Sequence, residues 1–293
     1  MILRDKPSLW TFLFSMRGSV LPRILPRIAA VSALAAVWVL LDGAYLTLPH
    51  TDAAPFAVFG IALSLFLGFR NNAAYERWWE GRRLWGQLIA DLRALARETG
   101  MFLPDPEARR GVLRLALAFL HLHRANLRRL PAAGAAAAWG GDAFAGAAHP
   151  PCAALNRLSG TAAAAAPDGF ARKALSERLA SITLAQAGCE RIAATPLPFV
   201  YSLLVFRTAY LYCLLIPLAL LDSAGWLTPL FTAIVAYVFF GLAEVTEELA
   251  DPFGETVNGL PLDAMCRTVE ISLSPHLDLD PPPPLAAQNY ILT

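Results

Sequence analysis

The residues whose spacing carries most meaning in this 293-residue chain lie in its second apolar segment. Ile61, Leu65 and Phe69 are four positions apart, so on a helix they share one slowly rotating face. Glu76 and then Glu80 continue that face. Two functions fit this pattern, an apolar face packed against other helices or the lining of an ion passage, in which acidic residues favour cations. Spacing alone leaves both open.

Other reactive side chains form no recognisable catalytic or metal-binding pattern. The four cysteines include no Cys-x-x-Cys pair, so neither a zinc site nor a disulfide framework is predicted. His121 and His123 point about 200° apart on a helix, which excludes a shared metal and favours surface positions. The carboxylates between Glu244 and Asp251 are best explained as a solvated face paired with arginines. We predict no enzyme, no cofactor and no bound metal.

The composition indicates a membrane protein. Hydrophobic residues make up 56% of the chain and charged residues only 16%, and the mean hydropathy is +0.48. Soluble domains carry roughly 25% charged residues. The 24 basic and 23 acidic residues leave a net charge of +1, which excludes a generally basic nucleic-acid-binding protein. The placement of charge is therefore more informative than its sum.

Four segments approach the roughly 20 apolar residues that a membrane-spanning helix needs. They are predicted at 28–48, 55–69, 197–221 and 226–243, and the second is long enough only if its helix continues further. Tight connections follow the first and third segments. The sequence therefore predicts four transmembrane helices in two hairpins.

Basic residues indicate the orientation, because short cytoplasmic loops collect Lys and Arg. Five precede Ile28, seventeen lie between Arg70 and Arg191, and neither hairpin connection contains one. Both termini and the middle region should therefore be cytoplasmic. The first residues lack the pattern of a cleavable signal, so we expect the first apolar segment to be retained.

The predicted organisation alternates membrane and cytosolic parts. In the cytosolic middle, helices are predicted at 70–99, 104–130 and 170–194, with a loosely ordered Ala/Gly/Pro-rich stretch at 131–167. The parts are an N-terminal segment 1–27, a first hairpin 28–69, a cytosolic helical region 70–195, a second hairpin 196–243, a helix with an Asp-Pro-Phe-Gly segment 244–274, and an extended tail 275–293.

Three stretches resemble the bestrophin family, in particular its bacterial members. They are LGFRNNAAYERWWEGRRLW at 67–85, TPLPFVYSLL from Thr195, and EELADPFGETVNGLPLDAMCR from Glu247 to Arg267. The similarity covers most of the chain and is weakest at 131–167. It implies an all-α membrane protein that forms a homopentamer around one axial pore in the bacterial inner (plasma) membrane.

The resemblance also assigns roles to residues. The family's neck positions match Ile61, Leu65 and Phe69, the face already found from spacing, and its cytosolic aperture corresponds to Leu179 or Ile182. The calcium clasp of animal members is built around a dense acidic run, whereas this chain has GETVNG there. Because calcium prefers six to eight oxygen ligands, we predict no calcium gating through this segment.

We therefore expect a channel for small monovalent ions, with the lipid bilayer and further copies of the chain as partners. Glu76 and Glu80 would form acidic rings below the neck, which favours sodium over chloride unless nearby arginines neutralise them. An anion channel like the animal members, and a non-conducting scaffold that binds a cytosolic partner, remain alternatives.

Overall fold

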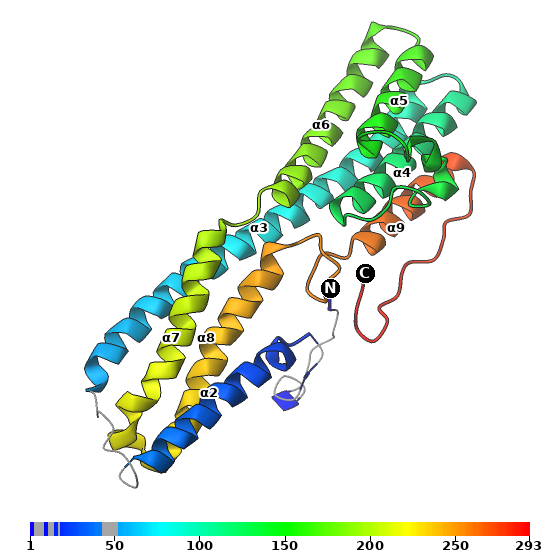
Figure 1. Ribbon diagram of the computed structural model, residues 1–293. Coiled ribbons are helices and arrows are strands. Elements are labelled where there is room, and N and C mark those ends of the chain that lie inside the picture. The colour runs from blue at the N-terminus through cyan, green and yellow to red at the C-terminus, as the bar shows by residue number, and fades with distance from the viewer. Residues whose placement is uncertain (3–8, 11–14, 17, 43–51) are drawn as a thin grey trace. The chain divides into compact units, whose positions relative to one another are not determined.

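The computed structural model describes residues 1–2, 9–10, 15–16, 18–42 and 52–293 (Figure 1). Within these residues the regular structure is helical, with only isolated β-bridges beside it, which confirms the all-α fold class. The α-helices are α2 (Leu21–Leu41), α3 (Ala53–Phe102), α4 (Pro106–Leu127), α5 (Pro150–Ala165), α6 (Gly169–Ala194), α7 (Phe199–Ala224), α8 (Thr228–Ala250) and α9 (Leu262–Leu273). The 3₁₀ helices are η1 (Ala137–Trp139), η2 (Gly141–Phe144), η3 (Gly225–Leu227) and η4 (Ser274–Leu277).

The chain divides into two compact units. The apolar unit comprises Asp5–Trp78 and Pro196–Ala250. The arginine-rich unit comprises Met1–Arg4, Trp79–Thr195 and Asp251–Thr293. The division falls inside α3, between Trp78 and Trp79, whereas the sequence pattern places the change from membrane to cytosolic parts at residue 70.

Three helical stretches of the described chain are long and apolar enough to cross a membrane. They are Leu21–Leu41, Ala53–Phe102 and Phe199–Ala250. The third contains both α7 and α8, which η3 separates. Gly225 at this turn has a φ of 49°, a conformation that glycine adopts without strain. The predicted break between the third and fourth segments is therefore confirmed at Gly225.

The second apolar segment does continue into one long helix. α3 runs for 50 residues because no helix breaker separates its apolar and polar halves. The first helix differs from the prediction, since α2 begins at Leu21 rather than at residue 28. Pro22 in its first turn explains this start, because proline is pre-organised for the first helical positions. Residues 43–48 of the predicted first segment lie outside the described residues, and so does the predicted connection at 49–52 apart from Asp52.

The stretch 131–167 is more ordered than predicted. It contains η1, η2 and the whole of α5. Pro150 occupies the first turn of α5, and the Nδ1 atom of His149 accepts a hydrogen bond from the Cys152 amide at 3.3 Å. Leu158, on the inner face of α5, is buried. Alanine is the best helix former, so an alanine-rich run becomes a helix once it is capped and packed.

Side chains from α2, α3, α7 and α8 form the core of the apolar unit. Ile24 of α2 and Leu67 of α3 are fully buried there, and Tyr212 of α7 meets Phe239 of α8 edge-on, with ring centroids 5.2 Å apart. Gly60 of α3 lies so close to α7 that a Cβ atom would come within 2.7 Å of the Tyr212 hydroxyl oxygen. This packing determines which face of α3 points inward.

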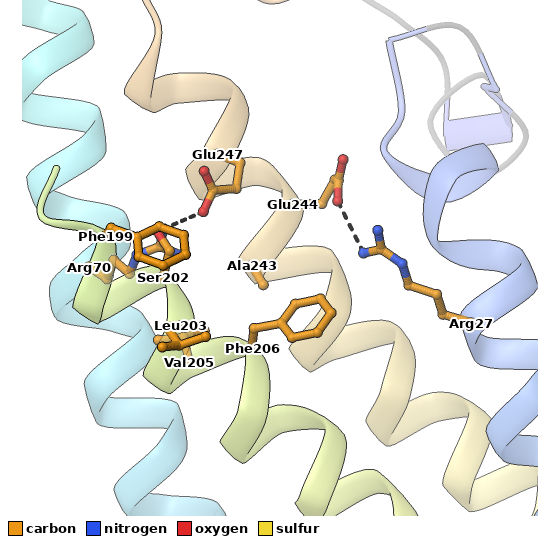
Figure 2. Close-up of a pocket in the computed structure, with 10 residues that line it drawn as sticks. All are labelled: Arg27, Arg70, Phe199, Ser202, Leu203, Val205, Phe206, Ala243, Glu244 and Glu247. Atoms are coloured by element: carbon orange, nitrogen blue, oxygen red, sulfur yellow. Dashed lines mark hydrogen bonds and ion pairs between the residues drawn. The ribbon is translucent and has the colours of Figure 1, made fainter. Parts of the chain in front are cut away.

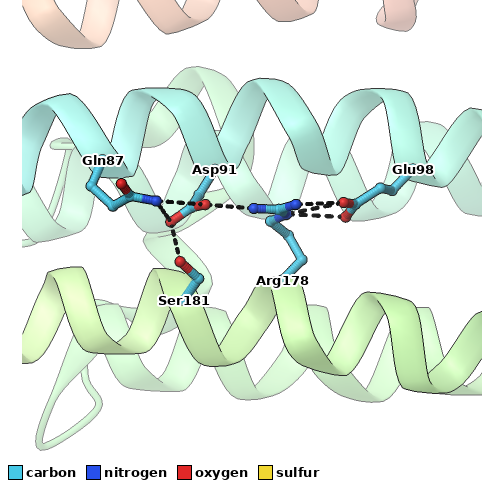
Figure 3. Close-up of polar contacts among 5 residues, drawn as sticks. All are labelled: Gln87, Asp91, Glu98, Arg178 and Ser181. Atoms are coloured by element: carbon cyan, nitrogen blue, oxygen red, sulfur yellow. Dashed lines mark hydrogen bonds and ion pairs between the residues drawn. The ribbon is translucent and has the colours of Figure 1, made fainter.

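A buried polar network joins α3 to α6 in the arginine-rich unit (Figure 3). Asp91 is 1% exposed and accepts hydrogen bonds from Arg178 Nη1 at 2.6 Å and from Ser181 Oγ at 2.7 Å. Arg178 also donates to Glu98, from Nη2 at 2.7 Å. Since an unpaired buried charge is expensive, these bonds fix the register of α6 along α3.

The expectation that His121 and His123 lie at the surface is wrong for His123. Its ring is fully buried and stacks between Trp85 and Phe119, at centroid distances of 5.8 Å and 5.7 Å. His121 is largely buried too, and its Nε2 atom lies 2.7 Å from Glu270 Oε1. Histidine is amphipathic, and at position 123 the aromatic packing outweighs its polarity.

This burial predicts a pH-dependent stability that His123→Phe should remove. Burial, with a smaller effect from His149, lowers the pKa of His123 to about 3. The unfolded chain takes up this proton near pH 6.5 and the folded chain does not, so the stability from the neutral ring is complete above that pH and is lost as pH falls toward 3. Between pH 6.5 and 4, the free energy of unfolding of the wild type should fall by about 3 kcal/mol relative to the variant.

Denaturant unfolding of both proteins across this pH range measures the difference. His276→Phe, which changes an exposed histidine, is the matched control and should keep the wild-type slope. Identical slopes for wild type and His123→Phe would contradict the assignment.

Candidate pore-lining face of α3

The three predicted neck residues lie on one exposed face of α3. The exposed fractions are 71% for Ile61, 59% for Leu65 and 65% for Phe69. In contrast, Leu63 is 4% exposed and Leu67 is fully buried in the core of the apolar unit. Large apolar side chains that are so exposed on one helix face are expected to contact lipid, another copy of the chain or the inside of a pore.

The same face continues as polar residues toward the end of the apolar unit. The space beside Gly68 is open, since no atom lies within 4 Å of the position a Cβ atom would take there. Asn72 and Glu76 are exposed. Tyr75, which the spacing argument passed over, is also exposed beside them. The three-residue step from Asn72 to Tyr75 is the signal that identifies it, since such pairs are neighbours on a helix.

Arginines on the opposite side hold this face outward. Arg70 follows Phe69 but is buried, where its Nη2 atom donates to Ser202 Oγ at 2.6 Å and pairs with Glu247. Arg77 Nε donates to the Ala250 carbonyl oxygen at 2.6 Å. Arg70, Arg77 and Arg83 are near enough in the sequence to be candidates for neutralising the acidic positions. Arg70 and Arg77 anchor α3 to α7 and α8, and so fix the rotation of α3.

The two acidic positions have different surroundings. Glu76 is exposed, whereas Glu80 is paired with Arg191 of α6 inside the arginine-rich unit. A carboxylate beside a guanidinium contributes little net field, so the two residues are not equivalent as charges. The sequence contains no local sign of this pair, because its partners are 111 positions apart.

The two candidates for the cytosolic aperture also differ. Ile182 has no exposed surface and forms part of the core of the arginine-rich unit. Leu179 is half-buried, and Leu184, which was not predicted, is exposed on the same helix. A residue that lines an aperture must present its side chain to water, so Leu179 and Leu184 fit that role better than Ile182 does.

Two motifs that carry the resemblance meet in the arginine-rich unit. Phe253 of the Asp-Pro-Phe-Gly segment is buried, and its ring lies 3.2 Å from the position a Cβ atom would take on Gly81. Leu260 lies close to the same position, at 3.5 Å. A larger residue at position 81 would displace the phenylalanine. This contact joins the first motif to the second within the arginine-rich unit.

Comparisons with known proteins identify the family of the chain. The family described as Bacterial/Fungal Bestrophin protein matches residues 1–275. The voltage-dependent anion channel-forming protein mll4386 of Mesorhizobium japonicum is 47% identical, over 99% of this chain and 96% of that protein. The voltage-dependent anion channel-forming protein YneE of Escherichia coli K12 is 38% identical, over 93% of each.

The fold has a solved counterpart as well. The crystal structure of a bacterial bestrophin homologue from Klebsiella pneumoniae matches with a TM-score of 0.80 and 30% identity, over 90% of this chain and all of that one. Sequence motifs, helix order and three-dimensional similarity therefore agree, and the chain belongs to the bestrophin family, in its bacterial and fungal branch.

Proposed function

We propose that this chain is the subunit of a homopentameric channel that passes small monovalent ions through a hydrophobic neck. Membership of the bestrophin family and channel-forming relatives support an ion channel rather than an enzyme. The observation that carries the proposal is the exposed apolar face of Ile61, Leu65 and Phe69. The channel would lie in the bacterial inner membrane with both termini in the cytoplasm.

The residue types account for how such a neck works. In a pentamer the three side chains form three stacked apolar rings around the axis. Apolar walls offer water no hydrogen bonds, so a narrow neck loses its water and closes to ions even where its radius would admit them. An oligomer is needed because four mostly apolar helices cannot enclose a water path within one subunit.

We propose a preference for cations such as sodium, set by Glu76. This carboxylate is exposed on the face that carries the neck residues, and rings of acidic side chains favour cations. Glu80 contributes less because Arg191 neutralises it. The proposal therefore assigns selectivity to Glu76 rather than to two equal rings.

An anion channel is the second candidate. The two relatives named above are described as anion channel-forming. Arg83 and Arg97 are exposed on the part of α3 that belongs to the arginine-rich unit, and rings of arginine favour anions.

Reversal potentials under a sodium chloride gradient separate the two candidates. We expect Glu76→Gln to move the reversal potential toward that of chloride, because it removes the exposed negative charge. Glu177→Gln, at an exposed carboxylate of α6, is the control and should leave it unchanged. A wild-type value already on the chloride side supports the anion channel, and no shift in Glu76→Gln sinks the acidic-ring assignment.

A further inference from the structure

A cavity of about 450 Å³ lies among α2, α3, α7 and α8 in the apolar unit (Figure 2). It is separate from the exposed face of α3, because Arg70 reaches it from the buried side of that helix. One wall is apolar and is formed by Phe199, Leu203 and Phe206 of α7. The other walls carry charges of both signs, so the cavity is amphipathic.

Two ion pairs line the cavity, and Figure 2 shows them at different sides of it. Arg70 pairs with Glu247, and Arg27 Nη1 lies 3.3 Å from Glu244 Oε2. The charges of these four residues cancel. A neutral lining gives no net attraction to a purely anionic or a purely cationic ligand, whereas it matches a ligand that carries both charges.

The first pair is incompletely satisfied. The side chain of Arg70 is 5% exposed, and its Nε atom has no hydrogen-bond partner within the described part of the chain. The carboxylate of Glu247 is 56% exposed and thus keeps acceptor capacity toward the cavity. A buried polar group without a hydrogen-bond partner indicates that a ligand or an ordered water binds there.

The aromatic wall already contacts one cationic side chain, that of Arg27. The guanidinium carbon of Arg27 lies 6.0 Å from the centroid of the Phe206 ring. Phe199, at the start of α7, is largely exposed beside it. Aromatic faces attract ammonium and guanidinium groups, so the wall suits both a cationic head and the apolar chain next to it.

The position of the cavity along the helices indicates the source of the ligand. Phe199 is the first residue of α7, and Glu247 lies in the last turn of α8. Both helices belong to a stretch that is apolar enough to cross a membrane. Helix ends of this kind lie at the depth of lipid head groups, where charged and aromatic side chains concentrate.

We propose that this cavity binds the head group of a zwitterionic phospholipid whose ammonium is primary, of the ethanolamine type. The ammonium donates hydrogen bonds to Glu247 and the phosphate pairs with Arg27. The first acyl carbons lie against Phe199 and Leu203. A primary ammonium has three donors to offer, and a phosphate accepts the fork of an arginine.

Native mass spectrometry of the purified full-length protein tests the proposal. The protein is equilibrated in detergent with dioleoyl phosphatidylethanolamine or dioleoyl phosphatidylglycerol, which share acyl chains, and the retained lipid is counted. We expect the ethanolamine lipid to bind about tenfold more tightly, since the glycerol head group has no ammonium for Glu247.

Single variants locate the binding. Arg27→Gln and Glu247→Gln should each weaken retention of the ethanolamine lipid by about tenfold. Arg207→Gln removes an exposed charge from α7 that does not line the cavity, and it should leave retention unchanged. If Glu247→Gln fails to fold, Arg27→Gln still tests the proposal. In that variant Glu244 loses Arg27 but still has Arg23 as an ion-pair partner, at 3.5 Å.

Three results would overturn the proposal. They are equal retention of the two lipids, full retention by Arg27→Gln, and displacement of the lipid by equimolar glycerophosphoethanolamine. The last result would assign the cavity to a soluble zwitterion. The readout involves no ion flow, so it succeeds or fails independently of whether the chain conducts.

Discussion

Replacing Ile61, Leu65 and Phe69 together with alanine is expected to raise ion flux through the reconstituted protein by about tenfold or more. Alanine shortens each exposed side chain, widens all three proposed rings and lets water remain in the neck. A tenfold rise corresponds to lowering the barrier by only about 1.4 kcal/mol, a modest demand for three rings. Sodium efflux from liposomes with matched protein content measures it.

A matched control removes a similar amount of apolar surface elsewhere in the apolar unit. Leu211, Leu230 and Phe231 are exposed residues of α7 and α8, and their triple alanine variant should keep the wild-type flux. If both triple variants leak equally, the increase reflects loosened packing and not an opened neck. If neither wild type nor neck variant conducts, the exposed face serves packing in a non-conducting scaffold.

Replacing Arg178 with methionine is expected to cost about 3–5 kcal/mol of folding free energy, the usual effect of removing one partner of a buried ion pair. Asp91 would stay 1% exposed with its guanidinium partner gone, and Glu98 would lose the same donor. We expect the thermal unfolding midpoint of the purified protein to fall by roughly 10 °C.

The location of the pair, and not its charge alone, should determine this loss. Lys173→Met breaks an exposed pair with Glu177 on the same helix, and it should cost at most about 0.5 kcal/mol. Asp91→Asn in the Arg178→Met background should recover part of the midpoint, because the amide carries no charge to bury. Equal midpoints for Arg178→Met and Lys173→Met would show that the network in Figure 3 does not hold α6 on α3.

Local pattern was sufficient for the long elements. No proline separates the apolar and polar halves of α3, which predicted one continuous helix, and 50 residues are helical. The helix predicted at 170–194 corresponds to α6, which Asp168 caps by accepting a hydrogen bond from the Ala171 amide at 2.8 Å. Spacing by four predicted that Ile61, Leu65 and Phe69 would share a face.

Contacts between segments that are distant in the chain could not be predicted from the sequence. The arginine that pairs with Glu80 is Arg191, on another helix, whereas sequence reasoning considered only arginines within α3. Likewise, nothing local to His123 shows that Trp85 and Phe119 enclose it. Periodicity tells which residues share a helix face but not what covers that face. For the same reason the sequence did not show that Ile182 is buried.

The most direct test of the central claim is the current carried by the purified wild-type protein in a planar bilayer under asymmetric sodium chloride. A channel of the proposed kind gives a passive current that does not saturate like a transporter, with a reversal potential displaced toward that of sodium. Absence of any current above that of protein-free bilayers, in the wild type and in the neck variant alike, would contradict the account.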